Sequence, residues 1–333
     1  MDNPVTILFD ALTAYQRTGA LKAAVELDLF TAVAEGRDTV ASLARHLKAS
    51  ERGVRGLCDA LAAVGFLDKR DGRYALAADF APFLDQRSPV CIAGAIHFLG
   101  NPRLLGAFAD LAAAVRKGGT VLDGQGSIEP ENPLWVEFAR AMAPIAGLVA
   151  QGVAGALGAE AGEPWKVLDV AAGHGLYGIT IAERNPHAEI TALDWASVLA
   201  VAQENARAAG VVRRFRTLPG SAFDVDWGRG YDLVLLTNFL HHFDPPTCEA
   251  IFARAHAALR PGGRAVTVEF VPDEGRTTPP AAATFTLVML ATTPAGDVYT
   301  FAEYERMARA AGFARSELRE IGSPQRAIFS YRD

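Results

Sequence analysis

The sequence predicts an α/β protein with a doubly wound sheet in its second half and a helical N-terminal half. The first observation is an alternation of apolar strands and helices that starts near Trp165 and continues almost to the end of the chain. The second is the glycine-rich turn AAGHG directly after the strand KVLDV. The third is a helix, helix and hairpin pattern in residues 39–75. The 333 residues suffice for about two domains.

The N-terminal half is predicted to be helical and to contain a winged-helix pattern. Apolar residues recur at helical spacing in residues 3–35, and TVASLARHL predicts a short amphipathic helix. Ser50 is suited to cap a second helix, which ends at Gly65. FLDKRDGRYALA then predicts two short strands around the turn Asp71-Gly72. Such a module is either a DNA-binding unit or a dimerisation scaffold.

The charge pattern disfavours DNA binding. The net charge is -6, so the chain as a whole has no field to attract phosphates. The second helix of the winged pattern mixes acidic and basic residues and has no basic face: Glu51, Arg52, Arg55 and Asp59. We therefore expect a scaffold and no nucleic-acid partner.

Cysteine usage and the N-terminus favour a cytoplasmic protein. Cys58, Cys91 and Cys248 are odd in number and far apart, so neither a disulfide framework nor a zinc cluster is implied. The start, MDNPVTILFD, lacks the basic residues and apolar core of a signal peptide.

Residues 88–160 are predicted to form connecting helices. Trp135, Phe138 and Met142 share one helical face, which belongs either to a core or to an apolar pocket. Residues 141–159 carry no charge, and this length is close to the ~20 residues of a membrane helix. The stretch is mostly Ala and Gly and includes Pro144, so a buried, closely packed helix is favoured over a membrane span.

The second half supplies the strands of the sheet and its first two helices. One helix is expected from the glycine turn to about Arg184, and another over residues 196–209. The predicted strands are KVLDV, EITALD, RRFRTLPG, YDLVLLTN and GRAVTVEFV, with ELREI and RAIFSY as a closing pair.

The turn after the first strand predicts a cofactor site. Ligands of such sheets bind beyond the carboxyl ends of the strands, where glycines let the backbone approach them. Asp194 ends the second strand and is suited to accept hydrogen bonds from ribose hydroxyls. Gly173, Gly175 and Gly178 also match the dinucleotide pattern G-x-G-x-x-G, which alone is weak. Asp169 would repel a pyrophosphate and suits the ammonium group of an amino acid, which disfavours an NAD enzyme.

VLDVAAGHG resembles the first motif of class I S-adenosylmethionine-dependent methyltransferases, with Ala171 in place of the usual first glycine. The later segments LPGSAFD, TNFLHHFD and ALRPGGRAVTVEF follow in the matching order. Nearly the whole chain is similar to the plant-type small-molecule O-methyltransferases and their bacterial relatives, such as antibiotic and pigment methyltransferases.

The resemblance implies S-adenosylmethionine as cofactor, a small-molecule acceptor and a homodimer. It also implies three regions: a winged-helix dimerisation domain over residues 1–100, connecting helices over 101–160 that contribute to the substrate pocket, and a Rossmann-like cofactor domain over 161–333. In this family the N-terminal module helps to wall the active site of the partner subunit.

The resemblance also implies the cofactor contacts. Asp194 would bind the ribose, and Trp195 would pack on the adenine. The contacts with the amino-acid part would come from Asp169, Ala171, Gly173 and Gly175. The segment that cups the adenine would be Ser221, Ala222 and Phe223, with Ser221 where the family usually has Asp. Thr237 stands where the family has a lysine, and Asn238 is a candidate substitute.

Methyl transfer to a hydroxyl requires alignment with the methyl group, exclusion of water and removal of a proton. His241 matches the catalytic histidine of the family, and Glu269 matches the glutamate that orients it. Replacing Glu269 is expected to cost less activity than replacing His241. His242 is either a second candidate base or a packing residue. His241, His242 and Asp244 are metal-binding residue types, but adjacent histidines in one loop rarely converge on one ion, so no metal is predicted.

The predicted acceptor is flat and largely apolar, such as an aromatic or a polyketide. The apolar candidates for its pocket are Phe98, Trp135, Phe138, Met142, Phe285 and Met289. A second glutamate of the family falls at Val298, next to Asp297, so this acid of the family's active site is not matched. The pair of His241 and Glu269 favours O-methylation. C- or N-methylation, or a cofactor-binding regulator without catalysis, are the alternatives.

Overall fold

The computed structural model describes residues 3–333. The described chain divides into two compact units, one ending at Pro102 and the other running from Arg103 to Asp333. Each unit has its own apolar core.

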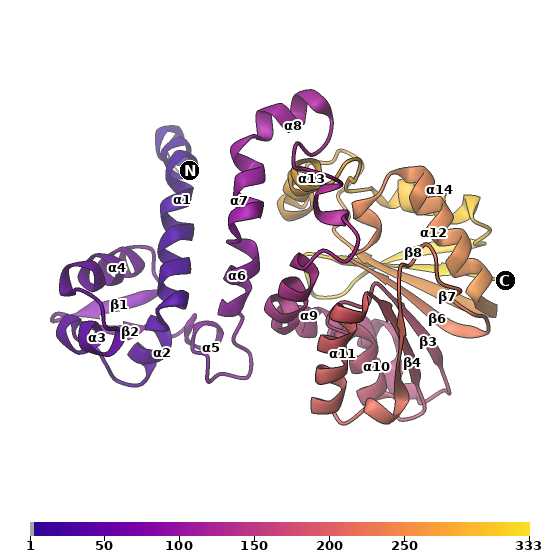
Figure 1. The fold of residues 1–333 in the computed structure, drawn as a ribbon, viewed down its shortest axis with the longest axis horizontal. Coiled ribbons are helices and arrows are strands. Elements are labelled where there is room, and N and C mark those ends of the chain that lie inside the picture. Colours follow the sequence, from indigo (N-terminus) through magenta and orange to yellow (C-terminus); the bar gives the residue numbers. More distant parts are fainter. Residues whose placement is uncertain (1–2) are drawn as a thin grey trace. The chain divides into compact units, whose positions relative to one another are not determined.

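The N-terminal unit is helical with one small hairpin (Figure 1). Its elements are α1 (Pro4–Glu26), α2 (Leu29–Ala34), α3 (Val40–Leu47), α4 (Glu51–Ala63), β1 (Leu67–Arg70), β2 (Arg73–Leu76), α5 (Ala81–Leu84) and α6 (Ile96–Leu99). The Oγ of Ser50 accepts a hydrogen bond from the backbone N of Gly53 at 3.1 Å and so caps α4. β1 and β2 pair antiparallel, and Asp71 and Gly72 between them both have positive φ. The predicted winged-helix pattern is confirmed.

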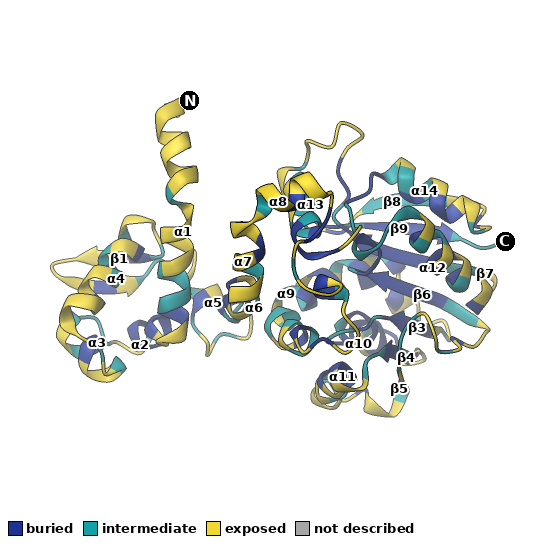
Figure 2. Ribbon diagram, turned by 45° about the horizontal axis from the view of Figure 1, so that its top comes forward, coloured by how far each residue is buried: buried dark blue, intermediate teal, exposed yellow. Residues whose placement is uncertain are grey.

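The first half of α1 carries an apolar row that does not enter the core of its unit. Val5, Leu8, Phe9 and Leu12 are each at least 60% exposed. Figure 2 shows this part of the helix as exposed, whereas Ala24 and Val25 near its end are buried. The core contains α2, α3 and α4 instead. The helical spacing was therefore predicted correctly, but its apolar side chains are not core residues of the described chain.

The second unit begins within α7 and contains the larger sheet (Figure 1). Its helices are α7 (Pro102–Ala109), α8 (Leu111–Lys117), α9 (Leu134–Leu157), α10 (Leu176–Arg184), α11 (Ala196–Ala208), α12 (Pro245–Ala258), α13 (Pro280–Thr292) and α14 (Phe301–Ala310). Its strands are β3 (Lys166–Val170), β4 (Glu189–Asp194), β5 (Phe215–Pro219), β6 (Tyr231–Thr237), β7 (Leu259–Glu269), β8 (Arg315–Glu320) and β9 (Arg326–Tyr331).

The sheet order is β5-β4-β3-β6-β7-β9-β8. Strands β3 to β7 pair in parallel, and β9 lies antiparallel between β7 and β8. The doubly wound sheet and its closing pair are confirmed. β7 begins earlier than predicted, because Leu259 already pairs with Tyr231 before a register shift. The strand order reverses at β3, so a crevice is expected beyond its carboxyl end.

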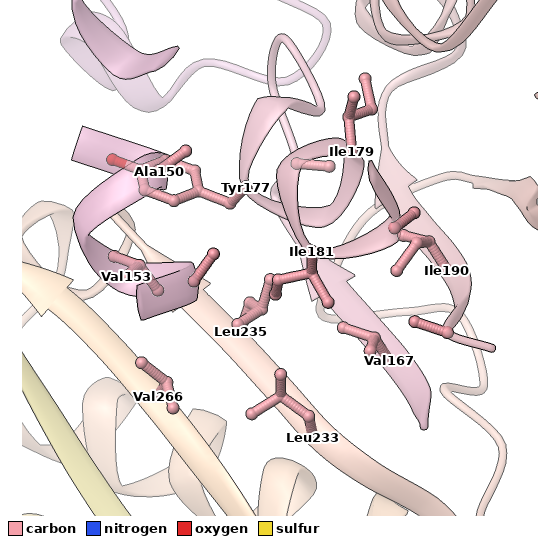
Figure 3. Packing of buried hydrophobic residues seen from close by; sticks show 14 of the residues in the cluster. Ala150, Val153, Val167, Tyr177, Ile179, Ile181, Ile190, Leu233, Leu235 and Val266 are labelled. Carbon is pink, nitrogen blue, oxygen red and sulfur yellow. The ribbon is translucent and has the colours of Figure 1, made fainter. Parts of the chain in front are cut away.

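Helices cover both faces of the sheet, which explains why its central strands are almost continuously apolar. One core contains Val167, Leu233 and Leu235 from the strands, packed against α9, α10 and α11. Figure 3 shows Ala150 and Val153 of α9 and Ile181 of α10 in this core. The opposite core contains Leu168 and Val234 packed against α12 and α14.

Helix α9 contains the charge-free stretch noted in the sequence. It is long and apolar enough to cross a membrane by length and composition. Its second half belongs to the sheet core, where Ala150, Val153 and Ala154 are buried. A Cβ on Gly152 would lie 2.1 Å from the carbonyl oxygen of Ile321, so glycine permits a close backbone contact. The small residues thus serve helix packing, as in the core helix that the sequence favoured.

Candidate functional site

The end of β3 carries a buried carboxylate with an unsatisfied oxygen. Asp169 is 0% exposed, and its Oδ2 accepts a hydrogen bond from the backbone N of Gly178 at 3.2 Å. Its Oδ1 is buried and has no hydrogen-bond partner among residues 3–333. Burial raises the pKa of Asp169 to about 8. An unpaired buried acceptor lowers the stability of the folded chain. The oxygen is therefore suited to bind a hydrogen-bond donor or a cation such as an ammonium group.

The turn after Asp169 folds back toward the next strand. Ala171 adopts φ 53°, a left-handed conformation that costs a non-glycine residue about 1 kcal/mol. This is the position where the sequence departs from the family glycine. Gly175 has φ 74°, and a Cβ there would lie 2.9 Å from the Cβ of Ala202. The turn therefore has left-handed residues at both Ala171 and Gly175, and at the first of these an alanine adopts that conformation.

Asp194, at the end of β4, lies directly beside this turn. Its Oδ2 accepts a hydrogen bond from the backbone N of Gly173 at 2.8 Å, and its Oδ1 accepts one from the N of Trp195 at 2.7 Å. Burial raises the pKa of Asp194 to about 6. The structure thus brings together the predicted amino-acid and ribose contacts. The Trp195 ring packs in a cluster with Trp135 and Ala139, so at least part of it faces α9.

The segment after β5 forms a tight turn. The Oγ of Ser221 accepts a hydrogen bond from the backbone N of Phe223 at 3.1 Å, and the indole N–H of Trp227 donates to the carbonyl oxygen of Ala222 at 3.0 Å. Phe223 is 43% exposed, and its ring makes an edge contact with that of Phe243 at 5.2 Å. The predicted adenine segment therefore lies next to the loop that carries the histidines.

His241 and Glu269 form a buried pair. The Nδ1 of His241 lies 2.5 Å from Oε2 of Glu269, which is 0% exposed. The other oxygen, Oε1, accepts hydrogen bonds from the backbone N of Phe239 and of Leu240, both at 3.0 Å. An ionised carboxylate fits these donors, so Nδ1 carries the ring proton toward Glu269 and Nε2 keeps its lone pair. This tautomer is the one that a general base requires.

His242 differs from His241 in its surroundings. Its ring lies 4.2 Å from that of His241 and 5.2 Å from that of Trp135. Its Nδ1 is buried without a hydrogen-bond partner in the described chain. Burial, together with the neighbouring His241, lowers the pKa of His242 well below its usual value. Asp244 caps α12 by accepting from the backbone N of Thr247 at 3.0 Å, and residues 3–333 contain no cluster of three metal-ligating side chains.

The predicted pocket residues include aromatic rings near His241 and His242. Phe285 of α13 makes an edge contact with His241 at 5.1 Å. Phe138 of α9 makes an edge contact with Trp135 at 5.7 Å and stacks on His174 of the glycine turn at 6.3 Å. Met142 and Met289 follow Phe138 and Phe285 by one helical turn and so share their faces. Phe98 belongs to α6 in the N-terminal unit, so its part in the pocket stays a prediction.

A polar network that the sequence did not reveal joins three elements near the site. Asn238 follows β6 with φ 53°. Its Nδ2 donates to the Tyr177 hydroxyl at 3.2 Å, and its Oδ1 accepts from Gln325. The amide of Asn238 is therefore already engaged, which weakens its predicted role as a cofactor contact. Tyr177 follows the glycine turn closely, but no sequence signal points to Gln325.

The loop before α14 also differs from the family pattern. Val298 is 2% exposed and provides no acid. The Oδ1 of Asp297 accepts from the Thr286 hydroxyl at 2.5 Å and from the backbone N of Val298 at 2.8 Å. This carboxylate thus fastens the loop to α13.

The strand order and the Asp169 carboxylate define the class of the protein. A buried carboxyl group with an unsatisfied oxygen directly before the turn needs a hydrogen-bond donor or a cation, and a pyrophosphate supplies neither, which argues against a dinucleotide enzyme. An acid at the end of the next strand completes the arrangement of a class I S-adenosylmethionine-dependent methyltransferase.

Comparison with known proteins agrees. A family model for an O-methyltransferase domain matches residues 108–314, and one for an O-methyltransferase dimerisation domain matches residues 9–79. The chain belongs to this O-methyltransferase family. It is an S-adenosylmethionine-dependent methyltransferase, and solved structures of this fold hold S-adenosylmethionine or its demethylated product.

Several relatives match over almost their whole length. The 3-hydroxy-5-methyl-1-naphthoate 3-O-methyltransferase of Streptomyces sahachiroi is 29% identical over 96% of this chain and 92% of its own. The tetracenomycin polyketide synthesis 8-O-methyl transferase TcmO of Streptomyces glaucescens is 30% identical over 93% and 92%. A crystal structure from Nostoc punctiforme, described as a candidate O-methyltransferase, is 49% identical with a TM-score of 0.94 and covers 100% of both chains.

Proposed function

We propose that this enzyme methylates a hydroxyl group of a small, largely apolar aromatic molecule, with His241 as general base. The observation that carries the proposal is the buried contact between His241 Nδ1 and Glu269 Oε2 at 2.5 Å. It favours the ring tautomer whose Nε2 can take a proton from the acceptor.

The cofactor is proposed to bind across the ends of β3, β4 and β5. The unsatisfied Oδ1 of Asp169 would receive its ammonium group, and Asp194 would receive the ribose hydroxyls. The adenine would lie at the segment of Ser221, Ala222 and Phe223. When bound, S-adenosylmethionine supplies a methyl group activated by its positive sulfur.

The residues of the chain would align the acceptor and remove its proton. A free imidazole has a pKa of ~6.5 and a phenol one of ~10, so complete proton transfer before methylation would cost about 5 kcal/mol. This cost falls if the proton leaves while the new bond forms, because the developing negative charge is consumed. Glu269 would stabilise the resulting imidazolium through the same contact. The surrounding rings of Trp135 and Phe285 would exclude water.

The class of acceptor is inferred from the lining and from the relatives. Trp135 of α9 adjoins His242 and Phe285 of α13 adjoins His241, and such a lining suits a flat apolar molecule. The two Streptomyces relatives are named for a hydroxynaphthoate and for a polyketide. Val298 stands where the family has a glutamate, so this position offers no carboxylate to the acceptor. We infer that the part of the acceptor near Val298 has few polar groups.

A screen tests the proposal. The purified protein would be incubated with S-adenosylmethionine and a panel of phenols, hydroxynaphthoates and aromatic polyketides, and the products analysed by mass spectrometry. We expect a methyl ether and an equal amount of S-adenosylhomocysteine. Products methylated only at carbon or nitrogen would overturn the O-methylation. Calorimetric binding of NAD, with none of S-adenosylhomocysteine, would overturn the cofactor assignment.

We further propose that the enzyme acts as a homodimer in the cytoplasm. The match to a dimerisation domain and the exposed apolar row on α1 support the homodimer. All three cysteines are free in the structure, which supports a reducing compartment.

A further inference from the structure

The segment between β5 and β6 is joined to the end of β4 at its start and contains a tight turn of its own. At its start, the backbone N of Gly220 donates to the carbonyl oxygen of Asp194 at 2.9 Å. Further on, the backbone N of Asp224 and of Val225 both donate to the carbonyl oxygen of Ser221 at 3.1 Å. Residues 220–230 form no strand or helix, so most backbone groups of this segment are not held by regular secondary structure.

Arg254 of α12 supplies this support. Its guanidinium donates one hydrogen bond to the carbonyl oxygen of Phe223 and another to that of Val225. Among residues 3–333, no carboxylate lies within ion-pair distance of Arg254. Its charge is therefore directed to backbone carbonyls. A rigid guanidinium fork can hold two carbonyls at a fixed spacing, which a lysine ammonium cannot do.

Trp227 provides a second side-chain contact that holds this segment. The guanidinium of Arg254 lies 5.0 Å from the centre of the Trp227 ring, and the indole N–H donates to the carbonyl oxygen of Ala222 at 3.0 Å. The carbonyl oxygens of Ala222, Phe223 and Val225 thus accept hydrogen bonds from two side chains that also contact each other. On the other side, the Phe223 ring contacts Phe243, which adjoins the histidine loop.

We propose that Arg254 is a positioning residue for cofactor recognition, which fixes the segment of Ser221, Ala222 and Phe223 so that it discriminates the edge of the adenine. The inference rests on the proposed placement of the adenine at this segment. Adenine offers an amino donor and a ring-nitrogen acceptor along one edge, whereas hypoxanthine reverses both. A backbone held at fixed positions can match only one of these patterns, whereas a loosened backbone adapts to either.

The test compares the affinities of S-adenosylhomocysteine and S-inosylhomocysteine by calorimetry. For the wild type we expect the adenine compound to bind about tenfold or more tightly, which corresponds to one reversed hydrogen bond. In Arg254→Met the ratio should fall to about two- to threefold, mainly through weaker binding of the adenine compound. Arg254→Lys should lie in between. In turnover assays, the loss in Arg254→Met should fall on the KM for S-adenosylmethionine more than on kcat.

Arg332→Met is the matched control. Arg332 also donates to two backbone carbonyls, those of His256 and Leu259, which lie at the end of α12 and outside the segment of residues 220–230. This variant should lose thermal stability and keep the wild-type binding ratio. An unchanged ratio in Arg254→Met or, if that variant does not fold, in Arg254→Lys would overturn the role of Arg254. A wild type that binds neither compound would instead refute the proposed cofactor site.

Discussion

At the scale of single residues, Asp169 combines a cost in stability with the role in cofactor binding that we propose for it. Its folded-state pKa of about 8 exceeds the ordinary value of 3.8. At a pH between these two pKa values, the carboxyl group of Asp169 is protonated in the folded chain and ionised in the unfolded chain. The wild type therefore loses stability as the pH rises from about 4 to 8. The cofactor's ammonium group would reverse this cost by pairing with the ionised carboxylate.

We predict that Asp169→Asn stabilises the cofactor-free chain by about 1–3 kcal/mol near pH 8 and by less near pH 5. Urea unfolding at both pH values measures the difference. The same variant should lose most of its affinity for S-adenosylhomocysteine. Asp226→Asn, at an exposed position, serves as the control. A stability gain that does not change with pH would contradict the account.

The contacts of Glu269 change an expectation from the sequence. Its Oε1 receives backbone N–H groups, so a glutamine there would keep its carbonyl oxygen on that side. The amide NH₂ would then face Nδ1 of His241 and place the ring proton on Nε2. We therefore predict that Glu269→Gln lowers turnover by about 10²–10⁴-fold, as much as loss of the base itself. Steady-state kinetics with saturating S-adenosylmethionine would show it; a loss below tenfold would argue against this tautomer.

At the scale of elements, α9 offers a matched pair of glycines. A Cβ on Gly152 would lie 2.1 Å from the carbonyl oxygen of Ile321, whereas on Gly155 the nearest atom would be 3.7 Å away, at the end of Arg184. We predict that Gly152→Ala destabilises the fold by about 1–3 kcal/mol. Gly155→Ala should be neutral or stabilise it by up to about 1 kcal/mol, because alanine favours the helix. Thermal unfolding compares the two. Equal changes in stability for the two variants would show that α9 does not approach the backbone of Ile321 so closely.

The elements were predictable from the sequence where the signal is local. The strand KVLDV, the glycine turn and the cap at Ser50 all depend on neighbouring residues, and each is found as predicted. Which apolar residues become buried depends on distant partners. The row at Phe9 has regular helical spacing and is nevertheless exposed.

In the site, too, only the residues with a local sequence signal could be predicted. His241 and Glu269 were singled out by the motifs at the ends of two strands, and adjacent parallel strands bring such ends together. The contacts of Asn238 with Gln325 and of Arg254 with Phe223 join segments far apart in the chain. Their residue types are common on surfaces, so no local pattern distinguishes them.

At the scale of the whole molecule, the exposed row on α1 predicts self-association. Light scattering at micromolar concentration should give about twice the 35.4 kDa chain mass. Phe9→Asp combined with Leu12→Asp should yield monomers, because charges would enter an apolar interface. Ala14→Asp, on the opposite face of the helix, should leave the dimer intact. A wild type that is monomeric at this concentration would refute the dimer.

The most direct test of the central claim is the turnover of His241→Ala with an acceptor found in the screen, measured alongside its affinity for S-adenosylhomocysteine. We predict a loss in turnover of about 10²–10⁴-fold with nearly unchanged cofactor affinity, because the Nε2 base is removed and the cofactor contacts remain. His242→Ala should lose little turnover. Near-normal turnover of His241→Ala across neutral pH would contradict the role of His241 as general base.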